Sequence, residues 1–91
     1  MSVTIKLPTP LRRHAGQAKV LEVEAATVGE ALGKLVEAHP AMRDSLFDSE
    51  GRVKQWVRVF LGERDIDDQR GVETPIADGD VISIIPPIAG A

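Results

Sequence analysis

Two stretches near the start of the chain alternate apolar and polar residues with a period of two. The segment "SVTIKL", residues 2–7, has valine, isoleucine and leucine at every second position, and a proline follows at once. The segment "KVLEVEA", residues 19–25, repeats the alternation with glutamates between the apolar residues. Such alternation is typical of half-buried β-strands, and proline cannot continue a sheet ladder. Residues 11–18, "LRRHAGQA", are predicted to be a loop that turns at Gly16, so that the two strands form a hairpin.

The period changes after Thr27, where apolar residues recur three and four positions apart. Together they form one stripe of an amphipathic helix. The apolar positions of this stripe are Val28, Ala31, Leu32, Leu35 and Val36. Thr27 and Glu30 have the spacing of a capping box, in which each side chain accepts a hydrogen bond from the other residue's backbone N–H. Pro40 is predicted to end the helix near His39.

The second half of the chain predicts shorter elements. Residues 41–47, "AMRDSLF", favour a short helical turn, and residues 48–52, "DSEGR", favour a loop. Residues 55–62, "QWVRVFLG", are rich in β-branched and aromatic residues and predict a third strand. Residues 71–80, "GVETPIADGD", contain proline and glycine and leave room only for a short strand or a turn. The last strand is predicted in residues 80–87, "DVISIIPP".

This order of elements predicts an α+β fold, with a mixed four- to five-stranded sheet packed on one main helix. The first and last strands are the most apolar, as central strands are, so we expect them side by side and parallel. That arrangement is the β-grasp, the ubiquitin-like roll. We expect residues 1–85 to form the β-grasp domain and residues 86–91 to form a flexible C-terminal tail.

Composition and charge narrow the possible functions. The chain of 91 residues has no cysteine, which excludes disulfides and thiolate chemistry and fits a cytoplasmic protein. No apolar run approaches the length of a membrane span, so no membrane contact is expected. The net charge of −3 argues against nucleic acid as a partner. Residues 63–70, "ERDIDDQR", carry both signs of charge and are expected to form a solvated loop.

Groups of residues typical of catalysis are nearly absent. His14 lies in a predicted loop and His39 ends a predicted helix, and neither has a partner at a recognisable spacing. The serines lack the sequence context of a nucleophile elbow. Residues 78–80, "DGD", lack the remaining ligand positions of a calcium loop. We therefore expect no catalytic residue and no metal site, and the chain is predicted not to be an enzyme.

The face of the last strand that points away from the helix is a candidate docking surface. If Ile82 and Ile84 face the helix, Ile85 faces outward. Ile88, beyond the prolines, and Phe60, on the neighbouring strand, can join Ile85 there. Isolated exposed apolar residues are normal on protein surfaces, whereas an apolar patch at this place would bind a partner. Both interpretations stay open.

The residues after this strand have very small side chains. Pro86 and Pro87 hold the chain extended. Ala89, Gly90 and Ala91 then present backbone with almost no bulk, which a partner can enclose in a narrow channel. The terminal carboxylate is the only group in this region that could be carried as a functional group. A free carboxylate is a poor electrophile, so a partner would first have to convert it to a mixed anhydride.

The sequence resembles a known family over essentially its whole length. Residues 77–91, "ADGDVISIIPPIAGA", resemble the C-terminal signature of the MoaD/ThiS ubiquitin-like sulfur carriers. Residues 3–32, "VTIKLPTPLRRHAGQAKVLEVEAATVGEAL", are similar to that family's first hairpin and helix. The likeness is greatest to the cysteine-biosynthesis branch, which shares "VTIKLPTPLRRHAG", "PAMRDSLFDSEGRVKQWVRVFLGERDI" and "ADGDVISIIPPIAG".

The resemblance implies that an E1-like enzyme uses ATP to adenylate the terminal carboxylate, and that sulfur displaces AMP to leave a thiocarboxylate on the end formed by Gly90 and Ala91. It further implies a PLP-dependent synthase that passes the sulfur to an activated serine derivative, and a Zn metalloprotease that trims the resulting C-terminal cysteine. The carrier itself would bind neither ATP nor PLP and would be a monomer when free. By position, Ile85 matches a family residue that contacts the partner. The implied partner-binding residues are Phe60, Ile85, Pro86, Pro87, Ile88 and Ala89.

Ala91 departs from the family, whose last residue is glycine. Its methyl group adds bulk and restricts φ where the adenylating channel fits glycine. Three explanations stay open: an engineered change, a precursor or a form that lacks the mature end, and a natural carrier whose partner accepts alanine. Two other functions also stay open. The chain could be a non-covalent ubiquitin-like interaction module, or a carrier for molybdopterin, thiamine or secondary-metabolite sulfur transfer.

Overall fold

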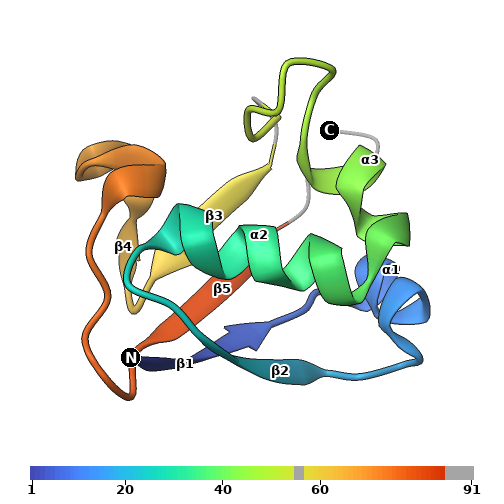
Figure 1. Cartoon of the computed structure of the whole chain (residues 1–91), viewed down its shortest axis with the longest axis horizontal. Helices are drawn as coiled ribbons and strands as arrows, with labels where there is room; N and C mark the ends of the chain where they lie inside the picture. The colour runs from blue at the N-terminus through green and yellow to red at the C-terminus, as the bar shows by residue number, and fades with distance from the viewer. Residues whose placement is uncertain (55–56, 86–91) are drawn as a thin grey trace.

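A five-stranded mixed sheet is covered on one face by a long helix, α2 (Figure 1). The computed structural model describes residues 1–54 and 57–85, and of Pro10 and His14 the backbone alone. The strands are β1 (Ser2–Lys6), β2 (Val20–Glu24), β3 (Arg58–Leu61), β4 (Arg64–Asp65) and β5 (Val81–Ile85). The α-helices are α1 (Thr9–Arg12), α2 (Val28–Ala38) and α3 (Arg43–Leu46). Four 3-10 turns complete the described part: η1 (Arg13–Ala15), η2 (Pro40–Met42), η3 (Ile66–Asp68) and η4 (Gly71–Glu73).

The strands lie in the order β2-β1-β5-β3-β4. Strand β1 pairs antiparallel with β2, as the predicted hairpin requires, and parallel with β5, where Ile5 is opposite Ile82. On its other side β5 pairs antiparallel with β3, where Ile84 is opposite Val59. The predicted β-grasp fold is therefore confirmed, and β5, the last element of the described residues, lies at the centre of the sheet.

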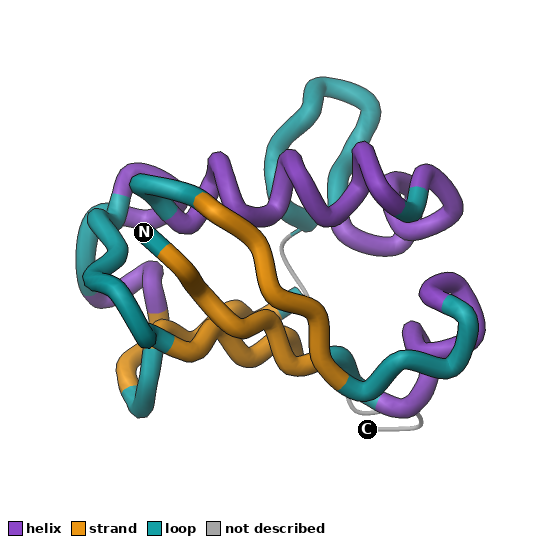
Figure 2. Tube along the Cα trace, turned by 60° about the horizontal axis from the view of Figure 1, so that its bottom comes forward, coloured by secondary structure: helices purple, strands orange, loops and turns teal. Residues whose placement is uncertain are grey.

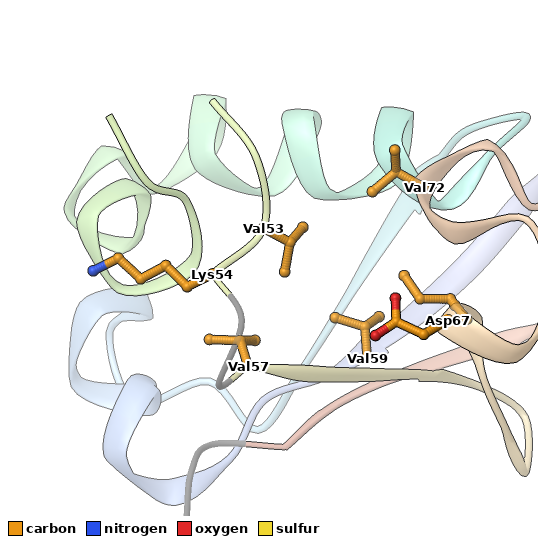
Figure 3. A pocket seen from close by; sticks show the side chains of 7 residues that line it. Val53, Lys54, Val57, Val59, Asp67 and Val72 are labelled. Atoms are coloured by element: carbon orange, nitrogen blue, oxygen red, sulfur yellow. The ribbon is translucent and has the colours of Figure 1, made fainter. Parts of the chain in front are cut away.

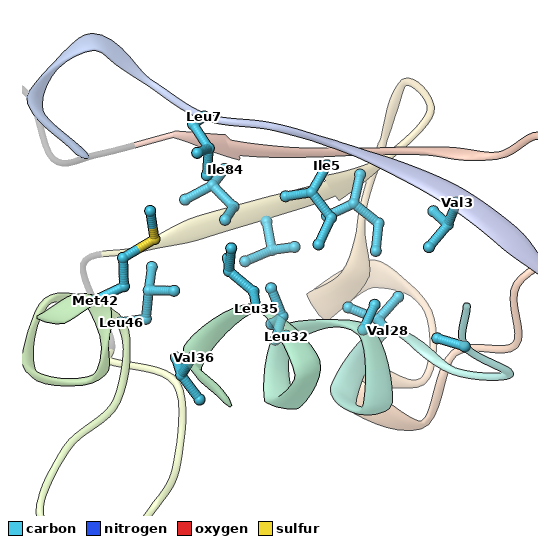
Figure 4. Close-up of a cluster of buried hydrophobic side chains, with 14 of the residues drawn as sticks. Val3, Ile5, Leu7, Val28, Leu32, Leu35, Val36, Met42, Leu46 and Ile84 are labelled. Atoms are coloured by element: carbon cyan, nitrogen blue, oxygen red, sulfur yellow. The ribbon is translucent and has the colours of Figure 1, made fainter. Parts of the chain in front are cut away.

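The core lies between α2 and the sheet (Figure 4). Helix α2 buries the whole predicted apolar stripe, namely Val28, Ala31, Leu32, Leu35 and Val36. The sheet contributes Val3 and Ile5 from β1 and Ile82 and Ile84 from β5. Met42 and Leu46, from the short helical segment predicted after α2, close one end of this layer. Burial of one such side chain contributes about 1.5–3 kcal/mol, so these facing positions stabilise the packing of helix on sheet.

The N-terminus of α2 forms one half of the predicted capping box. The Oγ1 atom of Thr27 accepts a hydrogen bond of 3.2 Å from the backbone N–H of Glu30. The second hydrogen bond of a capping box, from the Thr27 N–H to the Glu30 carboxylate, is not formed between these two described residues. His39 is the C-terminal cap of the helix, one residue before Pro40, as the sequence predicts.

The prediction of a loop in residues 11–18 is wrong in its first half. Helix α1 and turn η1 occupy residues 9–15, and the chain leaves them at Gly16, whose φ is 64°. Leu11 and Ala15 are four positions apart, so one helical face buries both. Burial of these two residues against the core explains why the segment is helical.

The prediction of a solvated loop in residues 63–70 is also wrong in part. Strand β4 and turn η3 form there, and Asp65 and Ile66 are only 7% and 4% exposed. A tight turn at Gly62, whose φ is 64°, folds β4 back onto β3. Strand β3 is shorter than predicted and begins at Arg58, while residues 55–56 lie outside the described part.

Residues 71–80 form turn η4 and then a tight turn, without a strand. The aspartates of the "DGD" segment have a structural role in this turn. Asp80 Oδ2 accepts the backbone N–H of Ala77 at 2.8 Å, and Asp78 Oδ1 accepts that of Ser2 at 2.7 Å. Gly79, whose φ is 88°, allows the reversal. This turn holds the beginning of the chain beside the start of β5.

Candidate functional site

The end of β5 has the alternation that the sequence predicts. Ile82 and Ile84 face α2 and are 0% and 3% exposed, whereas Ile85 points away from the helix and is 43% exposed. Hydrogen-bonded strands flank β5 on both sides, which fixes the position of Ile85 in the sheet. The predicted orientation of these three isoleucines is confirmed, while a partner-binding role for Ile85 stays a prediction.

Phe60 and Ile85 lie on the same outer face of the sheet. Phe60 is opposite Ser83, and Arg58 is opposite Ile85. Residues directly opposite in a ladder point to the same face, and diagonal neighbours are within reach of an aromatic side chain. Phe60 is half-buried, so part of its ring area remains accessible on this face. The structure thus brings these two predicted partner-binding residues together.

An ion pair that the sequence analysis missed lies beside them. Arg58 Nε is 3.2 Å from Asp65 Oδ2, and the Asp65 side chain is only 8% exposed. The other oxygen of Asp65 accepts the backbone N–H of Asp67 at 2.9 Å and so caps turn η3. Because the Arg58 side chain is 60% exposed, solvent screens the pair and its contribution to stability is at most about 1 kcal/mol. The pair directs the guanidinium of Arg58 toward β4, while the backbone of Arg58 stays opposite Ile85 in the ladder.

The remaining predicted site residues lie outside the described part of the chain. Their predicted roles, as partner contacts and as the covalent terminus, therefore stay predictions. These residues are Pro86, Pro87, Ile88, Ala89, Gly90 and Ala91.

A hollow of about 260 Å³ lies between the 47–54 loop, β3 and turns η3 and η4 (Figure 3). Its lining residues are Val53, Lys54, Val57, Val59, Ile66, Asp67 and Val72. The amine of Lys54 points away from the valines, and it donates a hydrogen bond to the backbone oxygen of Asp44. Among the described residues, the lining includes one carboxylate, that of Asp67, and no histidine, cysteine or serine.

Two other kinds of site were sought within residues 1–54 and 57–85. In that part of the chain no three His, Cys, Asp or Glu residues are grouped so that they could hold a metal ion. No helix there combines the length and the apolar character needed to cross a bilayer.

Among the described residues, the outer face at the end of β5 thus presents Ile85 and part of Phe60, with Arg58 and Ser83 beside them. Comparison with known proteins relates this geometry to a family. Residues 5–90 match the model of the ThiS family. The sulfur carrier protein CysO of Mycobacterium tuberculosis is 33% identical over 92 residues, which cover 99% of both chains.

Solved structures agree with the sequence comparison. A chain of the Amycolatopsis orientalis BexX/CysO complex has a TM-score of 0.89 and 31% identity, and the match covers 98% of this chain and 99% of that chain. SAMP1 from Haloferax volcanii has a TM-score of 0.88 and 30% identity over the full length of both chains. These relatives are small carriers rather than catalysts. The predicted likeness to CysO agrees with the 33% identity, and the chain therefore belongs to the ThiS family of ubiquitin-like sulfur carrier proteins.

Proposed function

We propose that this chain carries sulfur for cysteine biosynthesis, as a thiocarboxylate on the C-terminal carboxylate of Ala91. The observation that carries the proposal is the end of β5, where a central strand paired on both sides presents Ile85 on the outer face. Similarity to CysO, which covers 99% of both chains, supports the choice of pathway. A carrier of this kind needs a fixed surface for the partner to bind and a narrow chain end for the partner to enclose.

The proposed activation takes place on an E1-like enzyme. A carboxylate oxygen of Ala91 attacks the α-phosphorus of ATP, and pyrophosphate leaves. Hydrosulfide then attacks the carbonyl carbon of the mixed anhydride, the bond to AMP breaks, and a thiocarboxylate remains. The carrier contributes the carboxylate and the docking surface, while the enzyme binds ATP. A cytoplasmic location is part of the proposal because activation consumes ATP.

The later steps also belong to partners. A PLP-dependent synthase would pass the sulfur to an activated serine derivative, and a Zn metalloprotease would release the cysteine from the chain end. The carrier, a monomer when free, would bind neither cofactor itself. Phe60 and Ile85 would form the fixed part of the docking surface, and residues 86–89 would enter the partner's channel. A CysO chain was solved in complex with BexX, which supports protein partners for this fold.

The test is intact-mass analysis of the chain and of Ala91→Gly after incubation with the cognate E1-like enzyme, ATP and sulfide. Each product is then treated with a thiol-selective alkylating agent. The chain has no cysteine, so alkylation of the intact protein reports the thiocarboxylate. We expect Ala91→Gly to react faster, because glycine adds no bulk at the terminal Cα.

The outcomes separate the remaining explanations. Alkylation of the unchanged chain would show a working carrier that tolerates Ala91. Alkylation of the glycine variant alone would show a carrier fold that Ala91 blocks, and equal rates would contradict the steric argument. If neither form reacts, the carrier proposal fails and the non-covalent interaction module takes its place.

A further inference from the structure

Charged residues are unevenly distributed along the chain. Residues 6–20 contain four basic residues and no carboxylate, namely Lys6, Arg12, Arg13 and Lys19. Residues 61–80 show the opposite bias, with Arg64 and Arg70 as their basic residues. The carboxylates of that segment are Glu63, Asp65, Asp67, Asp68, Glu73, Asp78 and Asp80. Whether the basic and acidic segments also lie apart on the surface depends on the fold.

The two segments lie at opposite ends of the sheet. Strands β1 and β5 are parallel, so both end at the same edge, where Lys6 is opposite Ser83. Helix α1 and turn η1 lie beyond that edge (Figures 1 and 2), and the backbone oxygen of Lys19 accepts the N–H of Leu7 there. Strand β5 begins directly after the acidic turn that contains Asp78 and Asp80. It therefore runs from an acidic end of the molecule to a basic end.

The basic end has little internal neutralisation. Lys6, Arg13 and Lys19 are exposed and form no ion pair with any residue in the described part of the chain. Arg12 donates a hydrogen bond to the backbone oxygen of Leu7 at 3.1 Å, which leaves its charge uncompensated. Arg58, on the other side of β5, is paired with Asp65 and adds no net charge. Turn η2 packs against η1 at this end, and residues 34–54 around it carry four basic and four acidic side chains. The net positive charge of this end therefore comes from residues 6–20.

Two classes of macromolecule could bind such a surface. Single-stranded nucleic acid is usually held by basic residues together with aromatic rings on which bases stack. Residues 6–20 contain no Phe, Tyr or Trp, and the net charge of the chain is −3. A protein surface rich in carboxylates requires no such rings, so the observations favour a protein partner.

We propose that residues 6–20 form an electrostatic docking surface for protein partners whose channel entrance is rimmed by carboxylates. The inference rests on the proposed carrier function and names the partner chemistry of that site. The separation of charge along β5 would orient the basic end, where β5 ends at Ile85, toward such an entrance before contact. Steering of this kind raises association rates by about 10- to 1,000-fold, and salt weakens it.

The test compares two double variants with the same change in net charge. Arg13→Glu with Lys19→Glu reverses charges in the basic segment, and Arg64→Glu with Arg70→Glu reverses them at the other end. All four side chains are exposed, so both variants should fold, which circular dichroism and thermal melting would verify. Association with the cognate E1-like enzyme is measured by stopped flow at about 0.05 M and about 0.5 M salt, where screening lengths differ roughly threefold.

We expect the Arg13/Lys19 variant to associate at least about tenfold more slowly at low salt, with a smaller difference at high salt. The Arg64/Arg70 variant should stay within about threefold of the unchanged chain. Equal rates for the two variants, or a loss that salt does not reduce, would overturn the proposal while the unchanged chain still binds and is activated. If the unchanged chain does not associate, the carrier function fails and the inference fails with it.

A parallel titration with a 20-nucleotide oligouridylate tests the other class of partner. We expect no binding by the unchanged chain at physiological salt. Binding that the Arg13/Lys19 variant loses, together with an unchanged rate of association with the enzyme, would assign residues 6–20 to nucleic acid instead.

Discussion

Two adjacent isoleucines at the end of β5 have opposite surroundings. Ile84 is packed between the sheet and α2 at 3% exposure, and Ile85 is 43% exposed on the outer face. Ile84 belongs to the hydrophobic core and stabilises the fold. Ile85 contributes exposed apolar area at the end of β5. Their positions in the strand differ by one residue, so they form a matched pair for separating stability from partner binding.

We expect Ile84→Ala to lower the free energy of unfolding by about 2–5 kcal/mol, because it leaves a cavity in the core. Ile85→Ala should change it by no more than about 0.5 kcal/mol. The same Ile85→Ala change should weaken binding of the activating enzyme about tenfold, as expected for an anchor at an interface centre. Urea denaturation and binding titrations measure the two effects. Normal binding by Ile85→Ala would remove this residue from the docking surface.

Asp48 closes the loop between α3 and β3. Its Oδ1 atom accepts the backbone N–H groups of Glu50 at 2.9 Å and Arg52 at 3.0 Å. The hydrogen bond from Arg52 is the main cause that lowers the pKa of Asp48 below its usual value, and desolvation partly opposes it. A carboxylate with a lowered pKa in the folded state stabilises that state above the unfolded-state pKa of about 3.9. This contribution is lost as the pH falls through the lower, folded value.

We therefore expect the 48–52 loop to open in acid. In an NMR titration, the amide signal of Arg52 should shift with a midpoint below that of a short peptide of the same sequence. Asp48→Asn, which cannot titrate, should abolish the shift. A midpoint equal to that of the peptide would show that these hydrogen bonds do not hold the carboxylate in its charged form.

Helix α2 contains two glycines with different surroundings. A Cβ atom placed on Gly29 would lie 3.1 Å from both Cβ and the backbone oxygen of Val72, in turn η4. A Cβ atom on Gly33 would have no neighbour within 4 Å. Glycine at position 29 thus permits η4 to approach the first turn of the helix, and Gly33 has no comparable role.

In a helix, replacing glycine by alanine usually stabilises the folded state by about 0.5–1 kcal/mol. We expect this full gain for Gly33→Ala. Gly29→Ala should gain less or lose stability, because the backbone of η4 must move by a few tenths of an ångström. Chemical denaturation of both variants provides the comparison. An equal gain at the two positions would contradict the close approach of η4 to the helix.

At the scale of the whole molecule, the last strand among the described residues is also the central strand of the sheet. Strand β5 pairs with β1 and β3, and Ile82 and Ile84 belong to the core. The described buried residues all lie between Val3 and Ile84. The β-grasp domain should therefore be complete at Ile85, which leaves the residues after it available for chemistry.

We expect a chain that ends at Ile85 to unfold within about 0.5 kcal/mol of the full chain, since it keeps every described core contact. It should not be activated, because its terminal carboxylate would belong to Ile85, within the sheet. A chain that ends at Asp80 lacks two strand ladders and should not fold. Thermal melting and the alkylation assay report the two properties. A marked loss of stability in the Ile85-ended chain would show that residues 86–91 contribute to the fold.

Much of the fold could be predicted because its patterns are local. The apolar stripe of α2 and the outward direction of Ile85 follow from periods of 3.6 and 2 within a few residues. The mixed charges of residues 63–70 were less informative, because they predicted a solvated loop where β4 and η3 form. Asp65 and Ile66, within a charged segment, are buried because β4 folds back onto β3. The sequence placed Arg13 in a loop and Lys19 at the start of a strand, and only the packing of β1 beside β5 brings this segment to the end of β5.

The sequence by itself determined helix α2, the order of the main elements along the chain and the family. Each of these depends on periodicity or on motifs within short stretches. Only the tertiary structure decided which residues meet across long separations. Strand direction and register decide that Arg58 pairs with Asp65 and lies opposite Ile85. They also decide that residues 6–20 lie at the end of the sheet where β5 ends. Direction and register are set by how the whole core packs, and no local pattern encodes them.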